Sequence, residues 1–133
     1  PRSATINLFR RPFSQLSATM KKALVLIANG TEELEVVTIV DVLRRGGVTV
    51  NLAAVDKADP SVECALGTRI VPDSVLSSIS DPHAFDMVVL PGGSRAAETF
   101  KTNAAVQSLV RNYSGAGKPV AAICAAPTAL AAA

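Results

Sequence analysis

The sequence is poor in aromatic residues, in histidine and in cysteine. Its 133 residues include no tryptophan, one tyrosine, four phenylalanines, one histidine and two cysteines. So few aromatic side chains argue against a protein that stacks nucleic-acid bases. Two cysteines do not make a disulfide framework, and no Cys/His cluster has the spacing of metal ligands. The composition therefore favours a reducing compartment and predicts no metal site.

Long apolar runs and a basic surface are also absent. Apolar residues make up 49% of the chain, yet no run approaches the roughly 18 residues of a membrane-spanning helix. The net charge is +2, but three arginines precede Met20, and without these three the charge of residues 20–133 is −1. We therefore expect a globular protein that binds neither a membrane nor nucleic acid.

Residues 1–19 differ in composition from the rest of the chain. They contain three arginines, three serines and no acidic residue, which is typical of an organelle transit peptide. A disordered leader or translated upstream sequence is the alternative, and Met20 is also a natural start. We expect a leader at residues 1–19 and a domain at 20–133, cytoplasmic unless the leader directs it to a mitochondrion or plastid.

From Met20 onward, short apolar runs alternate with helical patterns. The runs typical of buried strands are residues 23–28, 48–55, 85–90 and 119–123, with weaker β candidates at 62–64 and 68–71. The first helix is expected to be capped by Thr31 and to end at Gly46-Gly47; further helical segments are expected in "DSVLSSI", 95–101 and 104–113. The alternation predicts an α/β fold with a flavodoxin-like, doubly wound, mainly parallel sheet flanked by helices. The sequence stops within an expected helix, so we expect an incomplete domain.

Three unusual loops follow predicted strands, and parallel strands place such loops on one edge of the sheet. They are residues 29–35 with a glutamate cluster, 90–94 with Gly92-Gly93, and 123–127 with Cys124. The last has the order strand, abrupt turn, nucleophile, helix. A thiol at a helix N-terminus faces the positive end of the helix dipole, which favours the reactive thiolate.

The other two loops carry groups that suit a cysteine nucleophile. The N–H groups of Gly92 and Gly93 are suitable for holding an oxyanion beside Cys124. We expect Glu35 to point inward, to stay protonated beside a thiolate and to exchange a proton. The plainer alternatives are that Cys124 is a small buried hydrophobe and that the glycines only make a turn. Cys64 is expected to serve packing or an interface.

Three segments carry a family resemblance: "KKALVLIANGTEELEVVTIVDVLRRGG", "FDMVVLPGG" and "AAICAAPTAL". Together, over residues 21–133, they resemble the DJ-one (parkinsonism-associated deglycase/glyoxalase) branch of the ThiJ/PfpI superfamily. The resemblance implies that Cys124 is a nucleophile readily oxidised to the sulfinate and that Glu35 is a protonated glutamate bonded to its sulfur. It also implies that the backbone of Gly92, Gly93 and Ala125 lines the anion site.

The resemblance further implies cofactor-free glyoxalase chemistry on methylglyoxal and glyoxal, or repair of early glycation adducts. The partners are then small reactive aldehydes or glycated proteins, and the assembly is a homodimer. A non-enzymatic oxidative-stress sensor and chaperone is the alternative. The family's catalytic histidine lies further along the chain than this sequence extends, and the surface-loop residue His83 does not match it. Leu66 replaces an arginine near the family's dimer contact. We expect negligible glyoxalase activity from these 133 residues alone.

Overall fold

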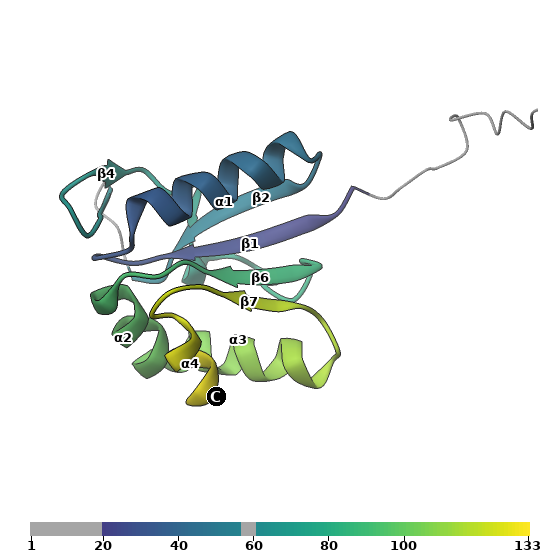
Figure 1. The fold of residues 1–133 in the computed structure, drawn as a ribbon. Coiled ribbons are helices and arrows are strands. Elements are labelled where there is room, and N and C mark those ends of the chain that lie inside the picture. Colours follow the sequence, from purple (N-terminus) through teal and green to yellow (C-terminus); the bar gives the residue numbers. More distant parts are fainter. Residues whose placement is uncertain (1–19, 57–60) are drawn as a thin grey trace, which may run out of the picture.

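A five-stranded parallel sheet in the order β5-β2-β1-β6-β7 forms the centre of the molecule (Figure 1). The computed structural model describes residues 20–56 and 61–133, so the predicted leader lies outside the described residues. The strands are β1 Lys22–Ile27, β2 Thr49–Ala54, β5 Ser74–Val75, β6 Met87–Leu90 and β7 Val120–Ala122, and a separate antiparallel hairpin contains β3 Val62–Glu63 and β4 Arg69–Ile70. The helices are α1 Glu33–Arg45, α2 Ser94–Thr102, α3 Ala104–Gly115 and α4 Pro127–Ala131. This arrangement confirms the predicted α/β, flavodoxin-like fold.

Strand β1 is apolar throughout its interior because helices cover both faces of the sheet. Helix α1 lies on one face, and α2, α3 and α4 lie on the other (Figure 1). Leu24 and Leu26 belong to the core that contains the α2, α3 and α4 side chains, whereas Val25 and Ile27 belong to the core under α1. Successive side chains of a strand point to opposite faces, so burial on both sides requires a continuous apolar run.

The turn between β1 and α1 corrects one prediction. Thr31 does not cap the helix: Glu32 holds the N-cap position and makes no side-chain capping bond. The fully buried Thr31 hydroxyl instead donates to the Ala28 carbonyl at 2.8 Å and accepts from the Ala28 N–H at 3.0 Å. This turn is buried at the edge of the sheet, where backbone polar groups need hydrogen-bond partners. The Thr31 hydroxyl therefore bonds the N–H and carbonyl of Ala28 at the end of β1 instead of an N–H group of α1.

Two further predicted elements can be compared with the structure. The segment "DSVLSSI" was expected to be a brief helix, but it begins with the short strand β5 and continues as a single 3-10 turn, Leu76–Ser78. Cys64 is 3% exposed and packs in the core under α1, as expected for a packing residue. Its burial, together with the negative charges of Glu33 and Glu32, raises the pKa of its thiol. Cys64 is therefore a structural cysteine.

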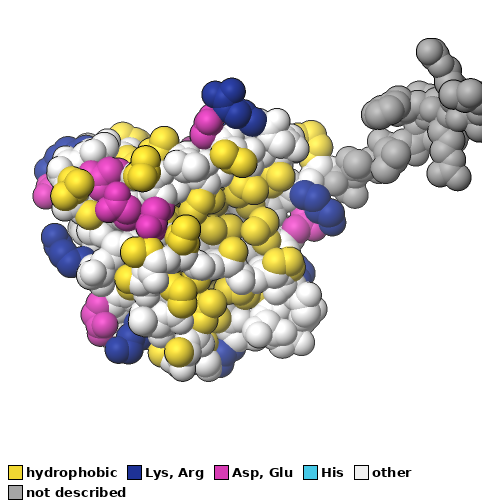
Figure 2. Space-filling view, viewed as in Figure 1, with side chains coloured by type: hydrophobic (Ala, Val, Ile, Leu, Met, Phe, Trp, Pro, Cys, Tyr) yellow, Lys and Arg dark blue, Asp and Glu magenta, His cyan; other side chains and the backbone are white. Residues whose placement is uncertain are grey.

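Among the described residues β7 is an edge strand of the sheet, and its residues are only half-buried. Figure 2 shows hydrophobic side chains across the middle of the face on which β6 and β7 lie in Figure 1. Ile123, which follows β7, is 49% exposed. Within residues 20–56 and 61–133, no helix combines the length and the apolar character needed to span a bilayer.

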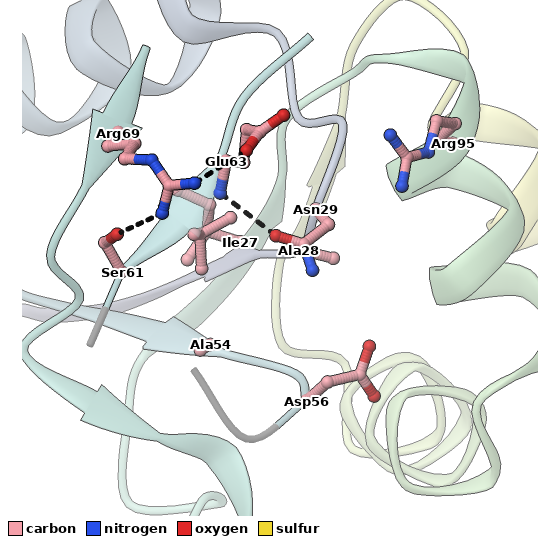
Figure 3. A pocket seen from close by; sticks show the side chains of 10 residues that line it. Ile27, Ala28, Asn29, Ala54, Asp56, Ser61, Glu63, Arg69 and Arg95 are labelled. Carbon is pink, nitrogen blue, oxygen red and sulfur yellow. Dashed lines mark hydrogen bonds and ion pairs between the residues drawn. The ribbon is translucent and has the colours of Figure 1, made fainter. Parts of the chain in front are cut away.

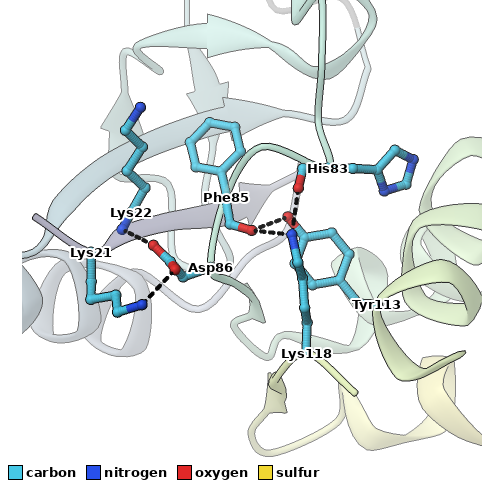
Figure 4. A network of polar contacts seen from close by, with 7 residues as sticks. All are labelled: Lys21, Lys22, His83, Phe85, Asp86, Tyr113 and Lys118. Carbon is cyan, nitrogen blue, oxygen red and sulfur yellow. Dashed lines mark hydrogen bonds and ion pairs between the residues drawn. The ribbon is translucent and has the colours of Figure 1, made fainter. Parts of the chain in front are cut away.

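Polar contacts hold together the edge of the sheet that is opposite the loops of interest (Figure 4). Lys118 Nζ donates to the carbonyls of His83 and Phe85 at 2.7 and 3.0 Å. The Tyr113 hydroxyl donates to the carbonyls of Pro82 and Phe85 at 2.8 and 3.2 Å. The exposed His83 therefore belongs to a structural loop before β6, as expected for a surface residue, and lies at the edge opposite Cys124.

Asp86 joins the starts of β6 and β1 in the same region. Its carboxylate accepts from Lys21 Nζ at 2.9 Å and from the Lys22 N–H at 2.8 Å. These two hydrogen bonds, led by that from Lys21, hold the pKa of Asp86 below its usual range. A carboxyl with a lowered pKa in the folded state stabilises that state at pH values above its unfolded pKa.

We predict that Asp86→Asn lowers the melting temperature of the full-length protein at pH 7. The difference from wild type should shrink below about pH 4 and vanish once Asp86 is protonated in the folded state. Thermal unfolding followed by circular dichroism between pH 2 and pH 7 measures this. Glu98→Gln is the control, because Glu98 only approaches Lys101 at 3.7 Å on an exposed helix face. A difference that is constant over the whole pH range would contradict the assignment.

Candidate active site

The three loops singled out by the sequence meet at the carboxyl ends of β1, β6 and β7. The Glu32 N–H donates to the Gly92 carbonyl at 3.0 Å, and the Ile123 N–H donates to the Leu90 carbonyl at 3.3 Å. Gly93 packs its Cα against the Gly30 carbonyl, where a side chain would collide. The second loop therefore lies between the first and the third and contacts both.

Gly92 is the point at which the predicted residues come together. A Cβ added to Gly92 would lie 2.6 Å from Glu35 Oε2, 2.6 Å from Cys124 Cβ and 3.1 Å from Cys124 Sγ. Such distances leave no room for a side chain, because Cβ atoms almost never approach other atoms within 3.0 Å. The missing side chain at Gly92 thus allows a carboxyl and a thiol from distant parts of the chain to share one small space.

Glu35 points inward from the first turn of α1, as expected. Its Oε2 accepts a hydrogen bond of 2.6 Å from the Gly92 N–H. Among the hydrogen bonds of residues 20–56 and 61–133, none joins Glu35 to the Cys124 sulfur. The Gly92 N–H, which the sequence assigned to an oxyanion, is therefore engaged by Glu35 in this structure.

Two other predicted donors remain available in the second and third loops. In the part of the chain that the structure describes, the N–H groups of Gly93 and Ala125 have no hydrogen-bond acceptor. Gly93 has φ +97°, a conformation that favours glycine, and it precedes α2 directly. Free backbone donors around a nucleophile are the elements of an oxyanion hole.

Cys124 has a strained backbone and an exposed side chain. Its φ of +58° makes it the one non-glycine residue with positive φ among the described residues. Such a conformation costs on the order of 1–3 kcal/mol and persists where the surroundings enforce it. The Ala126 N–H donates to the Ile123 carbonyl at 3.0 Å across Cys124, so a tight turn holds the residue in place.

Cys124 does not stand directly at the N-terminus of the helix that follows it, whereas the sequence suggested that it would. A turn at residues 124–126 separates the thiol from α4, which has five residues and begins at Pro127. The influence of a helix dipole is confined to the first turn of a helix. The turn and the free N–H groups, rather than the helix, therefore make up the polar surroundings of the thiol.

A pocket of about 370 Å³ lies beside these loops, at the ends of β1 and β2 (Figure 3). Its polar walls include Asn29, Glu63, Arg69 and Arg95, whose own sequence patterns do not indicate a site. Asn29 has the pattern of an ordinary turn residue, and an arginine in a helix is usually solvated. Only the fold brings these side chains to one place.

Comparison with known proteins identifies the chain's relatives. The model of the DJ-1/PfpI family matches residues 21–133. The chain belongs to the DJ-1/PfpI family. The chain is 41% identical to the zebrafish Parkinson disease protein 7 homolog, over 83% of this chain and 58% of that protein. It is 38% identical to the Caenorhabditis elegans glutathione-independent glyoxalase DJR-1.2, over 85% of this chain and 59% of that protein.

The DJ-1/PfpI fold is also evident in solved structures. Drosophila melanogaster DJ-1beta superposes with a TM-score of 0.80 at 40% identity, over 85% of this chain and 60% of that chain. An oxidized Toxoplasma gondii DJ-1 gives a TM-score of 0.76 at 34% identity, over 80% of this chain and 57% of that chain. The sequence thus spans less than two thirds of these family members.

We predict that Gly92→Ala disrupts the site. The methyl group would collide with Glu35 and Cys124, so the full-length protein should lose about 1–3 kcal/mol of unfolding free energy, as in other overpacked sites. Chemical denaturation measures the loss. Gly115→Ala is the matched control: Gly115 ends α3 with open space around its Cα, so the substitution should be neutral or stabilise by at most about 1 kcal/mol. Equal stability of the two variants would refute the close approach at Gly92.

Proposed function

We propose that the full-length protein is a cofactor-independent glyoxalase or deglycase with Cys124 as its nucleophile. The observation that carries the proposal is the meeting of an exposed, conformationally strained cysteine with the Glu35 carboxyl across Gly92. Strained residues cluster at active sites. A family relative bearing the name glutathione-independent glyoxalase supports the same reaction class.

The proposed reaction starts with addition of the Cys124 thiolate to the aldehyde carbon of an α-oxoaldehyde. A C–S bond forms, and the carbonyl π electrons move to the oxygen to give a hemithioacetal oxyanion. The N–H groups of Gly93 and Ala125, free among the described residues, stabilise this oxyanion. A preorganised donor of this kind is worth about 10²–10³ in rate.

Glu35 then moves a proton during rearrangement of the hemithioacetal. Glu35 first gives its own proton to the hemithioacetal oxyanion. The resulting carboxylate takes the proton from the former aldehyde carbon and returns it to the neighbouring carbon through an enediol, which leaves a thioester of a 2-hydroxy acid on Cys124. Water cleaves this thioester, so that methylglyoxal plus water gives lactate. Glu35 Oε2 and the Cys124 side chain approach the same point at the Gly92 Cα. The carboxyl is therefore within reach of a substrate carbon bonded to the Cys124 sulfur.

We predict that Cys124→Ser reduces methylglyoxal consumption by the full-length protein to background. Glu35→Gln should lower kcat about 10²–10⁴-fold, the range for loss of a general acid or base. Lactate release measured enzymatically follows both variants. Cys64→Ser is the control, because Cys64 is buried away from the site in the core under α1. Retained turnover in Cys124→Ser would defeat the proposal.

The second candidate is an oxidative-stress sensor that acts through oxidation of Cys124 rather than through turnover. The exposure of Cys124 favours it, and one solved family structure is described as oxidized. Mass spectrometry after mild peroxide treatment discriminates the two functions. A sensor gains two oxygens at Cys124 and not at the buried Cys64, and it shows no methylglyoxal turnover before oxidation.

We also propose that the full-length protein is a homodimer. Family members are commonly dimeric, and this chain exposes large apolar side chains on α1 and around the hairpin: Leu34, Val37, Val42, Leu66 and Val71. Val37 and Val71 line one shallow groove. An exposed apolar patch is typical of an interaction surface. The patch therefore supports pairing with a second copy of the chain.

We predict that Val37→Asp shifts the full-length protein from dimer to monomer. Val37 is 55% exposed, so the new charge is solvated in the monomer but must be desolvated in an interface across α1. Sedimentation velocity at micromolar concentration measures the shift. Ser108→Asp on the exposed side of α3 is the control and should remain dimeric. An unchanged dimer in Val37→Asp would place the interface elsewhere.

A further inference from the structure

The β3–β4 hairpin lies against the loop between β1 and α1, next to the first turn of α1 (Figure 1). The Gly30 N–H donates to the Glu63 carbonyl at 2.8 Å, and the Glu63 N–H donates to Asn29 Oδ1 at 3.0 Å (Figure 3). The Ala65 N–H donates to the Thr31 carbonyl at 2.8 Å. The hairpin is therefore joined to this loop from the end of β1 to the start of the helix.

The tip of the hairpin, residues 65–68, is held to α1 by the Glu33 carboxylate. Both carboxylate oxygens accept from the Leu66 N–H, each at 3.2 Å. The tip is a closed turn, because the Cys64 N–H donates to the Thr68 carbonyl at 2.8 Å. Cys64 is buried in the core under α1, whereas residues 65–68 are exposed. Apolar packing thus fixes the base of the hairpin, and hydrogen bonds to the β1–α1 segment fix its tip.

Glu33 meets the tip as an ionised acceptor. Hydrogen bonds from its own backbone N–H, from the Thr68 side chain and from the Leu66 N–H hold the pKa of Glu33 below its usual range. The residue also lies in the first turn of α1, where the positive end of the helix dipole favours a negative charge. Hydrogen bonds to an ionised acceptor are stronger than those between neutral groups.

The first turn of α1 lacks the usual side-chain cap. Glu32 holds the N-cap position without a side-chain capping bond, and the first N–H groups of a helix have no partner within the helix. Contacts from outside the helix hold this turn instead. The Glu32 N–H donates to the Gly92 carbonyl at 3.0 Å, and Glu33 binds the hairpin tip. Glu35 lies in the same turn, so its place depends on these contacts.

We propose that Glu33 is a positioning residue for Glu35. It fixes the hairpin tip to the first turn of α1, and this turn holds the Glu35 carboxyl 2.6 Å from the Gly92 nitrogen, beside Cys124. Without the Glu33 contact the turn frays and the Glu35 carboxyl leaves the Gly92 N–H. This inference rests on the proposed function, because Glu35 moves the proton in that reaction. Glu33 bonds the hairpin, so it acts on the reaction through Glu35.

The first test compares two substitutions of Glu33 in the full-length protein. Glu33→Met removes both acceptor oxygens and should lower kcat for methylglyoxal about tenfold with KM unchanged, because a misplaced proton carrier slows the reaction without weakening substrate binding. Glu33→Gln keeps one acceptor oxygen for the Leu66 N–H and should stay within about threefold of wild type. Glu32→Met is the matched control, because this neighbouring carboxylate makes no capping bond, and its kcat should equal that of wild type.

Steady-state kinetics of an active wild-type protein decides between these outcomes. An unchanged kcat in Glu33→Met, or a loss that Glu33→Gln shares in full, overturns the assignment. Sedimentation velocity should give the same oligomeric state for Glu33→Met and wild type. Dissociation that accompanies the loss of kcat would assign the effect to a subunit interface and would also overturn the assignment.

Hydrogen exchange tests the positioning without turnover. The Gly92 N–H is bonded to Glu35, so in ¹⁵N-labelled full-length protein it should exchange about tenfold faster in Glu33→Met than in wild type. Its rate in Glu33→Gln and Glu32→Met should stay close to that of wild type. The Val25 N–H, in the buried strand β1, should keep one rate in all four proteins, which shows that the variants remain folded.

The exchange rates separate this inference from the proposed function. An unchanged rate at Gly92 in Glu33→Met, or an equal rise at Gly92 and Val25, overturns the positioning role even if methylglyoxal is consumed. A rise at Gly92 alone, in a protein whose wild type consumes no methylglyoxal, supports Glu33 as the residue that positions Glu35 while the proposed reaction fails.

Discussion

The absence of a side chain at Gly92 is the constraint on which the candidate site depends. Glu35 comes from the helix after β1, and Cys124 comes from the turn after β7. Both approach the Gly92 Cα so closely that even a methyl group would collide with them. The Gly92 N–H also fixes the Glu35 carboxyl at 2.6 Å. One residue without a side chain therefore allows the carboxyl and the thiol to approach each other and fixes the orientation of the carboxyl.

This constraint explains how the strain at Cys124 is maintained. The residue would relax from φ +58° if its neighbours were free to move. On one side, β7 pairs with β6 and the Ile123 N–H bonds the Leu90 carbonyl. On the other, Ala126 is fully buried and its N–H closes the turn onto Ile123. The sheet and its core thus hold the turn at both ends.

The fold and the meeting of Glu35 with Cys124 could be predicted from the sequence, whereas the hydrogen bonding around these two residues could not. An apolar run such as that of β1 is dictated by burial on both faces, and parallel topology then places Glu35 and Cys124 at one edge. The hydrogen bond from the Gly92 N–H to Glu35 depends on the relative position of two segments far apart in the sequence, and shifts of a few tenths of an ångström decide whether it forms. The hydroxyl of Thr31 had two possible backbone partners, and only the burial of its turn decided between them.

Two kinds of polar group lie in different places at this edge of the sheet. Next to Cys124 the structure places backbone N–H groups and one carboxyl, while the free charges of Arg95 and Asp56 lie in the adjoining pocket. These two charges do not collapse onto each other because one is fixed to the start of α2 and the other follows the end of β2. Water in an open pocket solvates both, so keeping them apart costs little stability.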